Sequence, residues 1–253
     1  MLTVHNRHAT ARIALHGGQV LSFCPKGGAD LLFLSDLAVF QPGKAIRGGV
    51  PVCWPWFGAD PLGLGRPAHG LARTRAWHLQ RSATLPGGET LVELGLTDSA
   101  DTRALWPHAF DLTLEITVGA TLSLVLTTRN TGNSPFQITQ ALHSYFAVGD
   151  IARTTVVGLD GCHYIDKAYT DAPASLAVVD GALQRRIALQ VQGSRTAVVW
   201  NPWAAIAAGM ADLDDDGYQR FVCVETANAA DEVITVPPGG EHRLAVEIAV
   251  TPH

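Results

Sequence analysis

Hydrophobic and polar residues alternate in several parts of the chain, and the clearest run covers residues 110–118. In this run, FDLTLEITV, every second residue from Phe110 to Val118 is apolar, which is the period of a β-strand with one buried face. Gly119 and Ala120 follow, and the alternation resumes over residues 121–129. Two such runs joined by a short turn predict a β-hairpin.

Six further short runs alternate in the same way or are rich in β-branched residues, and each predicts a strand: residues 11–15, 90–97, 136–142, 196–200, 221–226 and 243–250. By contrast, residues 41–74 and 200–217 are rich in Gly, Pro and Trp, and long irregular loops of this kind usually belong to a binding site. The pattern predicts an all-β protein of stacked, mainly antiparallel sheets, with residues 1–253 forming a single domain.

Composition supports a turn-rich β architecture, because the 253 residues include 25 Gly and 14 Pro and only 16% of them are charged. The net charge is −5, and the 18 Lys and Arg residues are dispersed. Binding to duplex nucleic acid or to an anionic membrane needs a concentrated basic surface, so we expect neither partner. A small molecule is the more plausible ligand, and we expect the protein to be a monomer.

Four cysteines, at positions 24, 53, 162 and 223, are widely spaced and form no Cys-x-x-Cys pair. The first residues lack the basic and apolar regions of a secretory leader, and no apolar run approaches the ~18 residues of a membrane span. We therefore expect reduced thiols in a cytoplasmic protein.

Two arginines stand in the first glycine-rich and tryptophan-rich stretch. Arg47 precedes Gly48 and Gly49, and Arg73 lies three residues after Gly70. Two guanidinium groups in such loops could together hold a phosphate. The alternative is that each arginine forms an ordinary ion pair with a carboxylate.

A histidine and a glutamate lie on predicted strands at positions suited to proton transfer. His143 shares a face with the small residue Ala141, whereas the neighbouring Leu142 belongs to the apolar face. Glu225 ends the strand FVCVE, both faces of which are apolar, so this strand is expected to be central in its sheet. Glu225 lies either at the sheet rim in water or in a pocket, where burial would raise its pKa toward that of a general base.

Two other features have competing interpretations. Trp54 to Phe57 and Trp200 to Trp203 form aromatic clusters that could stack on a sugar ring or could simply fill the core. Asp212 to Gly217 matches the start of a calcium-binding loop, but the twelfth position is Cys223 rather than a carboxylate. An acidic turn is the better interpretation of the second feature, and we expect no metal.

Taken in order, five segments resemble the hexose-6-phosphate mutarotases (glucose-6-phosphate 1-epimerases) of the aldose 1-epimerase superfamily: AIRGGVPVCWPWFG at 45–58, PAHGLART at 67–74, ALHSYFAVGDI at 141–151, VWNPW at 199–203 and DDGYQRFVCVET at 215–226. The resemblance implies a galactose-mutarotase-like β-supersandwich with its active site on a concave sheet face. It also implies a cofactor-free enzyme that interconverts the α and β anomers of an aldohexose 6-phosphate, most plainly glucose 6-phosphate.

The resemblance also implies roles for particular residues. The family's catalytic histidine and glutamate correspond to His143 and Glu225. Its phosphate-binding or sugar-binding residues correspond to Arg47, Arg73 and His69, and Asp166 is the candidate for its substrate-binding aspartate, with Asp171 as the substitute. A binding or regulatory protein without catalysis and an epimerase for unphosphorylated aldoses are the alternative functions.

Overall fold

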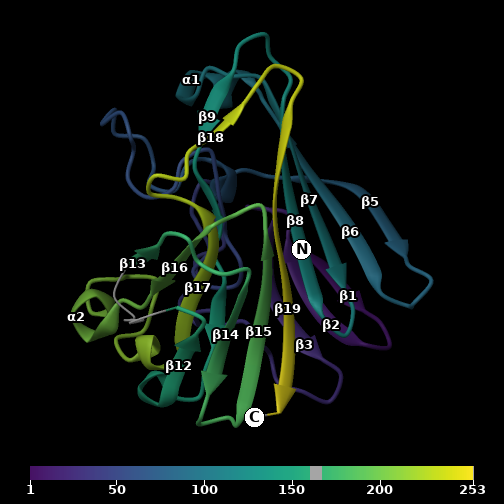
Figure 1. The fold of residues 1–253 in the computed structure, drawn as a ribbon, viewed down its shortest axis with the longest axis vertical. Helices are drawn as coiled ribbons and strands as arrows, with labels where there is room; N and C mark the ends of the chain where they lie inside the picture. The colour runs from purple at the N-terminus through teal and green to yellow at the C-terminus, as the bar shows by residue number, and fades with distance from the viewer. Residues whose placement is uncertain (160–166, 253) are drawn as a thin grey trace.

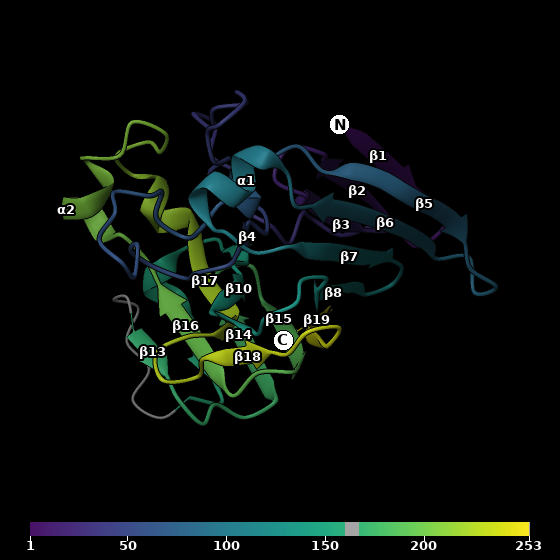
Figure 2. The same ribbon diagram turned by 90° about the horizontal axis from the view of Figure 1, so that it is seen from above.

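The computed structural model describes residues 1–159 and 167–252, and its regular secondary structure is mainly antiparallel β-sheet (Figures 1 and 2). The largest sheet has eight strands in the order β12-β14-β15-β19-β8-β7-β6-β5. Their bounds are β5 His78–Thr84, β6 Thr90–Thr97, β7 Phe110–Val118, β8 Leu122–Asn130, β12 Thr154–Val157, β14 Ser175–Asp180, β15 Arg185–Gln192 and β19 Glu241–Pro252.

A second, six-stranded sheet contains the strands of the candidate site. Its order is β13-β16-β17-β10-β4, and β11 also pairs with β17. The bounds are β4 Val52–Cys53, β10 Gln140–Leu142, β11 Tyr145–Ala147, β13 Lys167–Tyr169, β16 Thr196–Trp200 and β17 Phe221–Asn228. Strand β17 has neighbours on both sides, which confirms the prediction of a central strand.

Smaller elements complete the fold. A three-stranded sheet contains β1 Leu2–His5, β2 Ala9–Ala14 and β3 Gln19–Pro25, and a two-stranded sheet pairs β9 Phe136–Ile138 with β18 Ile234–Val236. The helical elements are short: α1 Ala100–Leu105, α2 Trp203–Ala207, and the 3₁₀ turns η1 Ala72–Thr74, η2 Ile151–Arg153 and η3 Gly217–Arg220. Among the described residues, no helix has the length and apolar character needed to cross a membrane.

Burial follows the alternation that the sequence predicts. In β7 the apolar residues are buried and the polar residues between them are half-buried, and Leu112, Leu114 and Ile116 have no exposed surface. Burying one such side chain contributes about 1.5–3 kcal/mol relative to leaving it in water. The same core cluster includes Val222 and Val224 of β17, so one face of the six-stranded sheet packs on the main core and the other is left for a site.

The predicted strand over 136–142 is two strands in two sheets. β9 pairs with β18, whereas β10 pairs with β17 and β4. At Thr139, between them, the backbone N–H donates to the carbonyl of Pro55 (3.1 Å) and the hydroxyl accepts from Phe57 N–H (2.9 Å). These contacts with the 41–74 stretch move the chain from one sheet to the other, and alternation within residues 136–142 does not reveal them.

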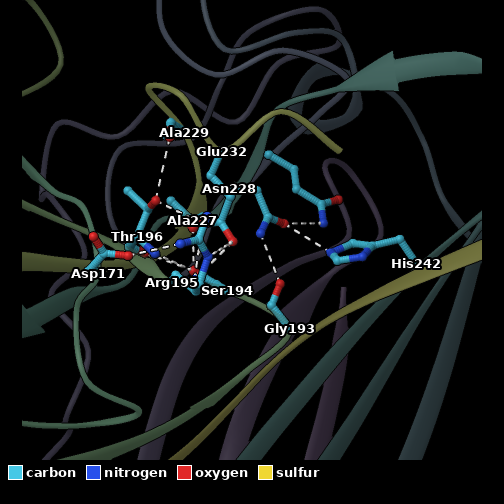
Figure 3. Close-up of polar contacts among 11 residues, drawn as sticks. Asp171, Gly193, Ser194, Arg195, Thr196, Ala227, Asn228, Ala229, Glu232 and His242 are labelled. Atoms are coloured by element: carbon cyan, nitrogen blue, oxygen red, sulfur yellow. Dashed lines mark hydrogen bonds and ion pairs between the residues drawn. The ribbon is translucent and has the colours of Figure 1, made fainter. Parts of the chain in front are cut away.

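Buried amide groups connect the end of β17 to the eight-stranded sheet (Figure 3). The side chain of Asn228 is fully buried; its Nδ2 donates to the carbonyl of Gly193 (2.9 Å) and its Oδ1 accepts from Gln140 (2.9 Å). Nε2 of His242 on β19 lies 3.1 Å from the same Oδ1. Because buried polar groups are costly unless they are paired, this network favours one relative position of β17 and β19.

Candidate active site

His143 and Glu225 lie opposite each other on neighbouring chain segments of the six-stranded sheet. Leu142 pairs with Thr226 at the end of β10, and Tyr145 pairs with Cys223 at the start of β11. Between these pairs the same register sets His143 against Glu225, and side chains at directly opposed positions of antiparallel strands are close neighbours. Nε2 of His143 lies 3.3 Å from Oε1 of Glu225.

The sheet face predicted for His143 is the face that the structure gives it. Ala141 lies in a cluster of buried residues apart from the main core, whereas Leu142 belongs to the main core. Both His143 and Glu225 are buried. Nδ1 of His143 is also buried and has no hydrogen-bond partner among the described residues, so Nε2 is the ring nitrogen available for exchange of a proton with Glu225.

A cavity of about 460 Å³ opens at this pair. Five of the residues expected from the sequence line it together: Arg47, His69, Arg73, His143 and Glu225. The remaining lining residues are Phe57, Gly58, Ala59, Ala68, Tyr145 and Trp200. The cavity therefore combines a proton-transfer pair with two guanidinium groups, and it is large enough for a small polar ligand.

Burial, and to a smaller extent the positive groups of the cavity, make its histidines poor bases. Burial lowers the pKa of His143 well below 6.5, and the nearby His69, Arg73 and Arg47 lower it further. Burial likewise lowers the pKa of His69 to about 4, with smaller contributions from Arg73 and Arg47. At neutral pH both imidazoles are consequently uncharged in the unliganded protein.

A tight turn of the backbone places His69 and Arg73 beside the cavity. Gly70 has a φ of +74°, and a Cβ there would lie 2.0 Å from the carbonyl oxygen of Trp54, so only glycine fits. His69 also has a positive φ, 61°, and its backbone N–H donates to the Gly58 carbonyl (2.7 Å) while its Nδ1 accepts from Gly58 N–H (3.3 Å). These bonds tie the two ends of the 58–69 loop together at the cavity.

The two arginines differ in their partners. Arg73 donates from one terminal nitrogen to the carbonyl of Ala68 (2.9 Å), and its Nε is buried without a hydrogen-bond partner. Within residues 1–159 and 167–252, no carboxylate forms an ion pair with Arg73. Arg47 is instead paired with Asp212 at 3.1 Å and donates to the hydroxyl of Tyr145 (3.0 Å). The alternative of an ordinary ion pair thus applies to Arg47 and not, in the described structure, to Arg73.

The tryptophans of the two aromatic clusters differ in role, since some fill the core and one lines the cavity. Trp54 is fully buried in the main core, and its Nε1 donates to the hydroxyl of Thr128 (3.1 Å). Trp56 is also buried and is covered by the guanidinium of Arg66, 4.1 Å from its ring centroid. Of the tryptophans in the two clusters, only Trp200 lines the cavity with His143, so the core-filling interpretation holds for Trp54 and Trp56.

Of the two aspartates considered for substrate binding, Asp171 is the one in the described part of the chain, and it does not line the cavity. Asp166 lies outside the described residues. Asp171 is exposed on the surface and pairs with Arg195 at 2.8 Å (Figure 3). In the acidic segment, Asp212 pairs with Arg47 and Asp214 with Arg220. The described residues contain no group of three or more His, Cys, Asp or Glu side chains arranged to hold a metal ion.

Sequence reasoning missed two residues of the site, Tyr145 and Asp212. Tyr145 is buried, lines the cavity and stacks on His143. It stands two positions after His143, so counting along the strand face could have identified it. Asp212 is 165 positions from Arg47, and no local pattern predicts that contact.

A buried imidazole–carboxylate pair in a polar cavity is the machinery of an acid–base enzyme. The model of the aldose 1-epimerase family matches residues 1–166 and 155–249 of this chain. The chain therefore belongs to the aldose 1-epimerase family.

Relatives and solved structures agree with that family. A protein of Escherichia coli K12 named "Putative glucose-6-phosphate 1-epimerase" is 41% identical, over 91% of this chain and 84% of the relative. The crystal structure of a "putative mutarotase" from Salmonella typhimurium has a TM-score of 0.91 at 35% identity and covers 99% of this chain and 90% of its own. A galactose mutarotase-like protein from Lactobacillus casei superposes with a TM-score of 0.75 at 15% identity, covering 99% of this chain and 100% of that one. The predicted galactose-mutarotase-like, all-β fold is confirmed.

Proposed function

We propose that this enzyme interconverts the α and β anomers of an aldohexose 6-phosphate, with glucose 6-phosphate as the expected substrate and without a cofactor. The observation that carries the proposal is the 3.3 Å separation of His143 Nε2 and Glu225 Oε1 in a cavity that also contains Arg47 and Arg73. The relatives named as glucose-6-phosphate 1-epimerases support the choice of substrate.

The close approach of the two groups suits the chemistry of an anomeric centre. The C1 hydroxyl and the ring oxygen of an aldose are bonded to the same carbon, so an acid and a base that act on them must lie side by side. Glu225 as a carboxylate would remove the C1 hydroxyl proton while the His143 imidazolium gives a proton to the ring oxygen, and the C1–ring oxygen bond breaks to form the aldehyde. After rotation about C1–C2, the reverse transfers close the ring on the other face. Each positioned acid or base contributes a rate factor of about 10²–10⁴.

The phosphate would supply both orientation and a change in protonation. Arg73 and Arg47 would hold the phosphate away from C1, so that binding energy from the remote group orients the reacting centre. These same cations contribute to the lowered pKa of His143. A bound phosphate dianion offsets their charge, which raises the pKa of His143 and favours the imidazolium that ring opening needs.

Exchange spectroscopy by NMR, on glucose 6-phosphate and on glucose, tests the proposal. We expect the protein to accelerate exchange between the anomers of glucose 6-phosphate much more than that of glucose. Absence of acceleration for both sugars would indicate a binding protein without catalysis, and equal acceleration would indicate an epimerase for unphosphorylated aldoses.

We propose in addition that residues 1–253 act as one domain and as a monomer in the cytoplasm, with Asp166 as a substrate-binding residue. Among the described residues, Cys24, Cys53 and Cys223 are free thiols, as suits a reducing compartment. Light scattering coupled to gel filtration tests the monomer, and Asp166→Asn should raise the KM for glucose 6-phosphate.

A further inference from the structure

The acidic segment at residues 212–217, whose sequence resembles the start of a calcium-binding loop, contacts the candidate active site through Asp212. Nε of the Arg47 guanidinium donates a hydrogen bond to Oδ2 of Asp212 (3.2 Å), and a terminal nitrogen of the same guanidinium lies 3.1 Å from that oxygen in an ion pair. Both side chains are about three-quarters buried. Contact through two nitrogens sets the direction of a guanidinium more strictly than a single bond does.

The other partner of Arg47 leads to the catalytic pair. A second terminal nitrogen of Arg47 donates to the hydroxyl of Tyr145 (3.0 Å), and the Tyr145 ring stacks on the ring of His143. Asp212, Arg47, Tyr145, His143 and Glu225 therefore form one continuous series of contacts that ends at the group proposed to take the C1 proton.

Arg47 can also donate hydrogen bonds to a ligand in the cavity. A guanidinium has five N–H groups, and the hydrogen bonds to Asp212 and Tyr145 use two of them, so other N–H groups of Arg47 remain for a ligand in the cavity. The carboxylate also offsets the charge of Arg47, whereas Arg73 has no such partner among the described residues. Arg47 is thus suited to directed hydrogen bonding, and Arg73 to attracting charge.

The residue that follows each member of the Arg47–Asp212 ion pair has its position fixed by the surrounding fold. After Arg47, Gly48 has a φ of +114°, and a Cβ there would lie 2.4 Å from the carbonyl oxygen of Phe33. After Asp212, Leu213 is buried in the cluster that also contains Tyr145. The backbone on each side therefore brings the two side chains to the same place.

We propose that Asp212 is a positioning residue of the active site, whose carboxylate orients Arg47 so that the remaining N–H groups of this guanidinium bind the substrate. This inference rests on the proposed function, because it assigns a task to the same cavity. Without the carboxylate, Arg47 would lose its direction and the substrate would bind more weakly, while the proton-transfer pair would be intact.

The test compares Asp212→Ala with Asp214→Asn, a carboxylate two positions away that pairs with Arg220 instead. In the NMR exchange assay we expect Asp212→Ala to raise the KM for glucose 6-phosphate about tenfold and to change kcat less than threefold. Asp214→Asn should change neither value. Asp212→Glu, which restores a carboxylate, should recover part of the loss in KM.

Calorimetric titration with glucose 6-phosphate provides a readout that does not depend on catalysis. We expect Asp212→Ala to weaken Kd by about the same factor as KM, and equal unfolding temperatures for the two variants would show that both are folded. An unchanged or lower KM and Kd in a folded Asp212→Ala protein would overturn the positioning role. If Asp212→Ala does not fold, the Kd of Asp212→Asn decides in its place.

The two proposals fail in different ways. A wild-type protein that binds glucose 6-phosphate without accelerating anomer exchange contradicts the proposed function, and the Kd comparison still tests Asp212. A wild-type protein that does not bind the sugar phosphate contradicts both proposals.

Discussion

The imidazole of His143 is stacked face to face on the phenol ring of Tyr145, with ring centroids 4.8 Å apart and ring planes 10° apart. Tyr145 is two residues further along the same chain segment, so the pair occupies adjacent positions on one face of the sheet. The stack determines which edge of the imidazole meets Glu225. Tyr145 therefore makes two contacts that bear on the proposed chemistry, the stack on His143 and the hydrogen bond that its hydroxyl accepts from Arg47.

Separate substitutions of Tyr145 should distinguish these two contributions. We expect Tyr145→Leu, which removes the stack, to lower kcat by up to about tenfold, because aromatic pairs of this kind contribute about 0.5–1.5 kcal/mol. Tyr145→Phe keeps the ring and loses the acceptor for Arg47, so it should raise KM with little change in kcat. Steady-state NMR exchange kinetics measure both constants. The same kcat loss in both variants would show that the hydroxyl, and not the stack, matters.

Removing the proposed base should separate catalysis from binding. Glu225→Gln keeps the size and hydrogen-bonding capacity of the side chain but cannot take a proton at neutral pH. We expect kcat to fall by about 10²–10⁴ while the Kd for glucose 6-phosphate stays within a few fold. Anomer exchange and calorimetric titration of the same preparation measure the two effects. Near-full activity of this variant would remove Glu225 from the mechanism.

Arg73 should carry the preference for a phosphorylated sugar. Its Nε is buried without a hydrogen-bond partner and no described carboxylate offsets its charge, so an anion would satisfy both requirements. Hydrogen bonds to charged groups contribute about 1.5–3 kcal/mol, so Arg73→Gln should raise the KM for glucose 6-phosphate by about 10–150-fold. The kcat/KM for unphosphorylated glucose should change little. Equal losses for the two sugars would assign Arg73 to the sugar ring or to the fold.

The sequence predicted the proton-transfer pair because Glu225 lies on a regular strand and His143 lies between two short strands that pair with it. Alternation located the strand of Glu225 and the face of His143, and the central position of β17 followed from its two apolar faces. Two features depend on contacts between distant segments and were not predictable in the same way. The break at Thr139 depends on Pro55, and the orientation of Arg47 depends on Asp212.

The tryptophan-rich segments likewise indicated a functional region, but they did not indicate which tryptophan lines the cavity. Trp54 directly follows β4 and Trp200 ends β16, and a proline comes within two residues after each, yet the first fills the core and the second lines the cavity. The difference arises from which face of the sheet each segment covers. Tertiary packing determines which face each segment covers, and the local sequence pattern does not reveal it.

Acid should destabilise the folded protein through the histidines of the cavity. The pKa of His69 is about 4 in the folded state, mainly because of burial, and about 6.5 in the unfolded chain. Between these values the unfolded state binds the proton and the folded state does not. The contribution of His69 to stability is therefore complete above pH 6.5 and is lost as the pH falls toward 4, at up to about 1.4 kcal/mol per pH unit. The lowered pKa of His143 acts with the same sign.

Calorimetric unfolding of wild type and His69→Gln between pH 7.5 and about 4.5 measures this term, with the exposed His5→Gln as the matched control. We expect the free energy of unfolding of the wild type and of His5→Gln to fall with similar slopes below pH 6.5. His69→Gln cannot take up that proton, so its slope should be smaller by as much as one proton's contribution. Parallel slopes for all three proteins would mean that His69 is charged in the folded state, and the neutral cavity inferred for the unliganded enzyme would be wrong.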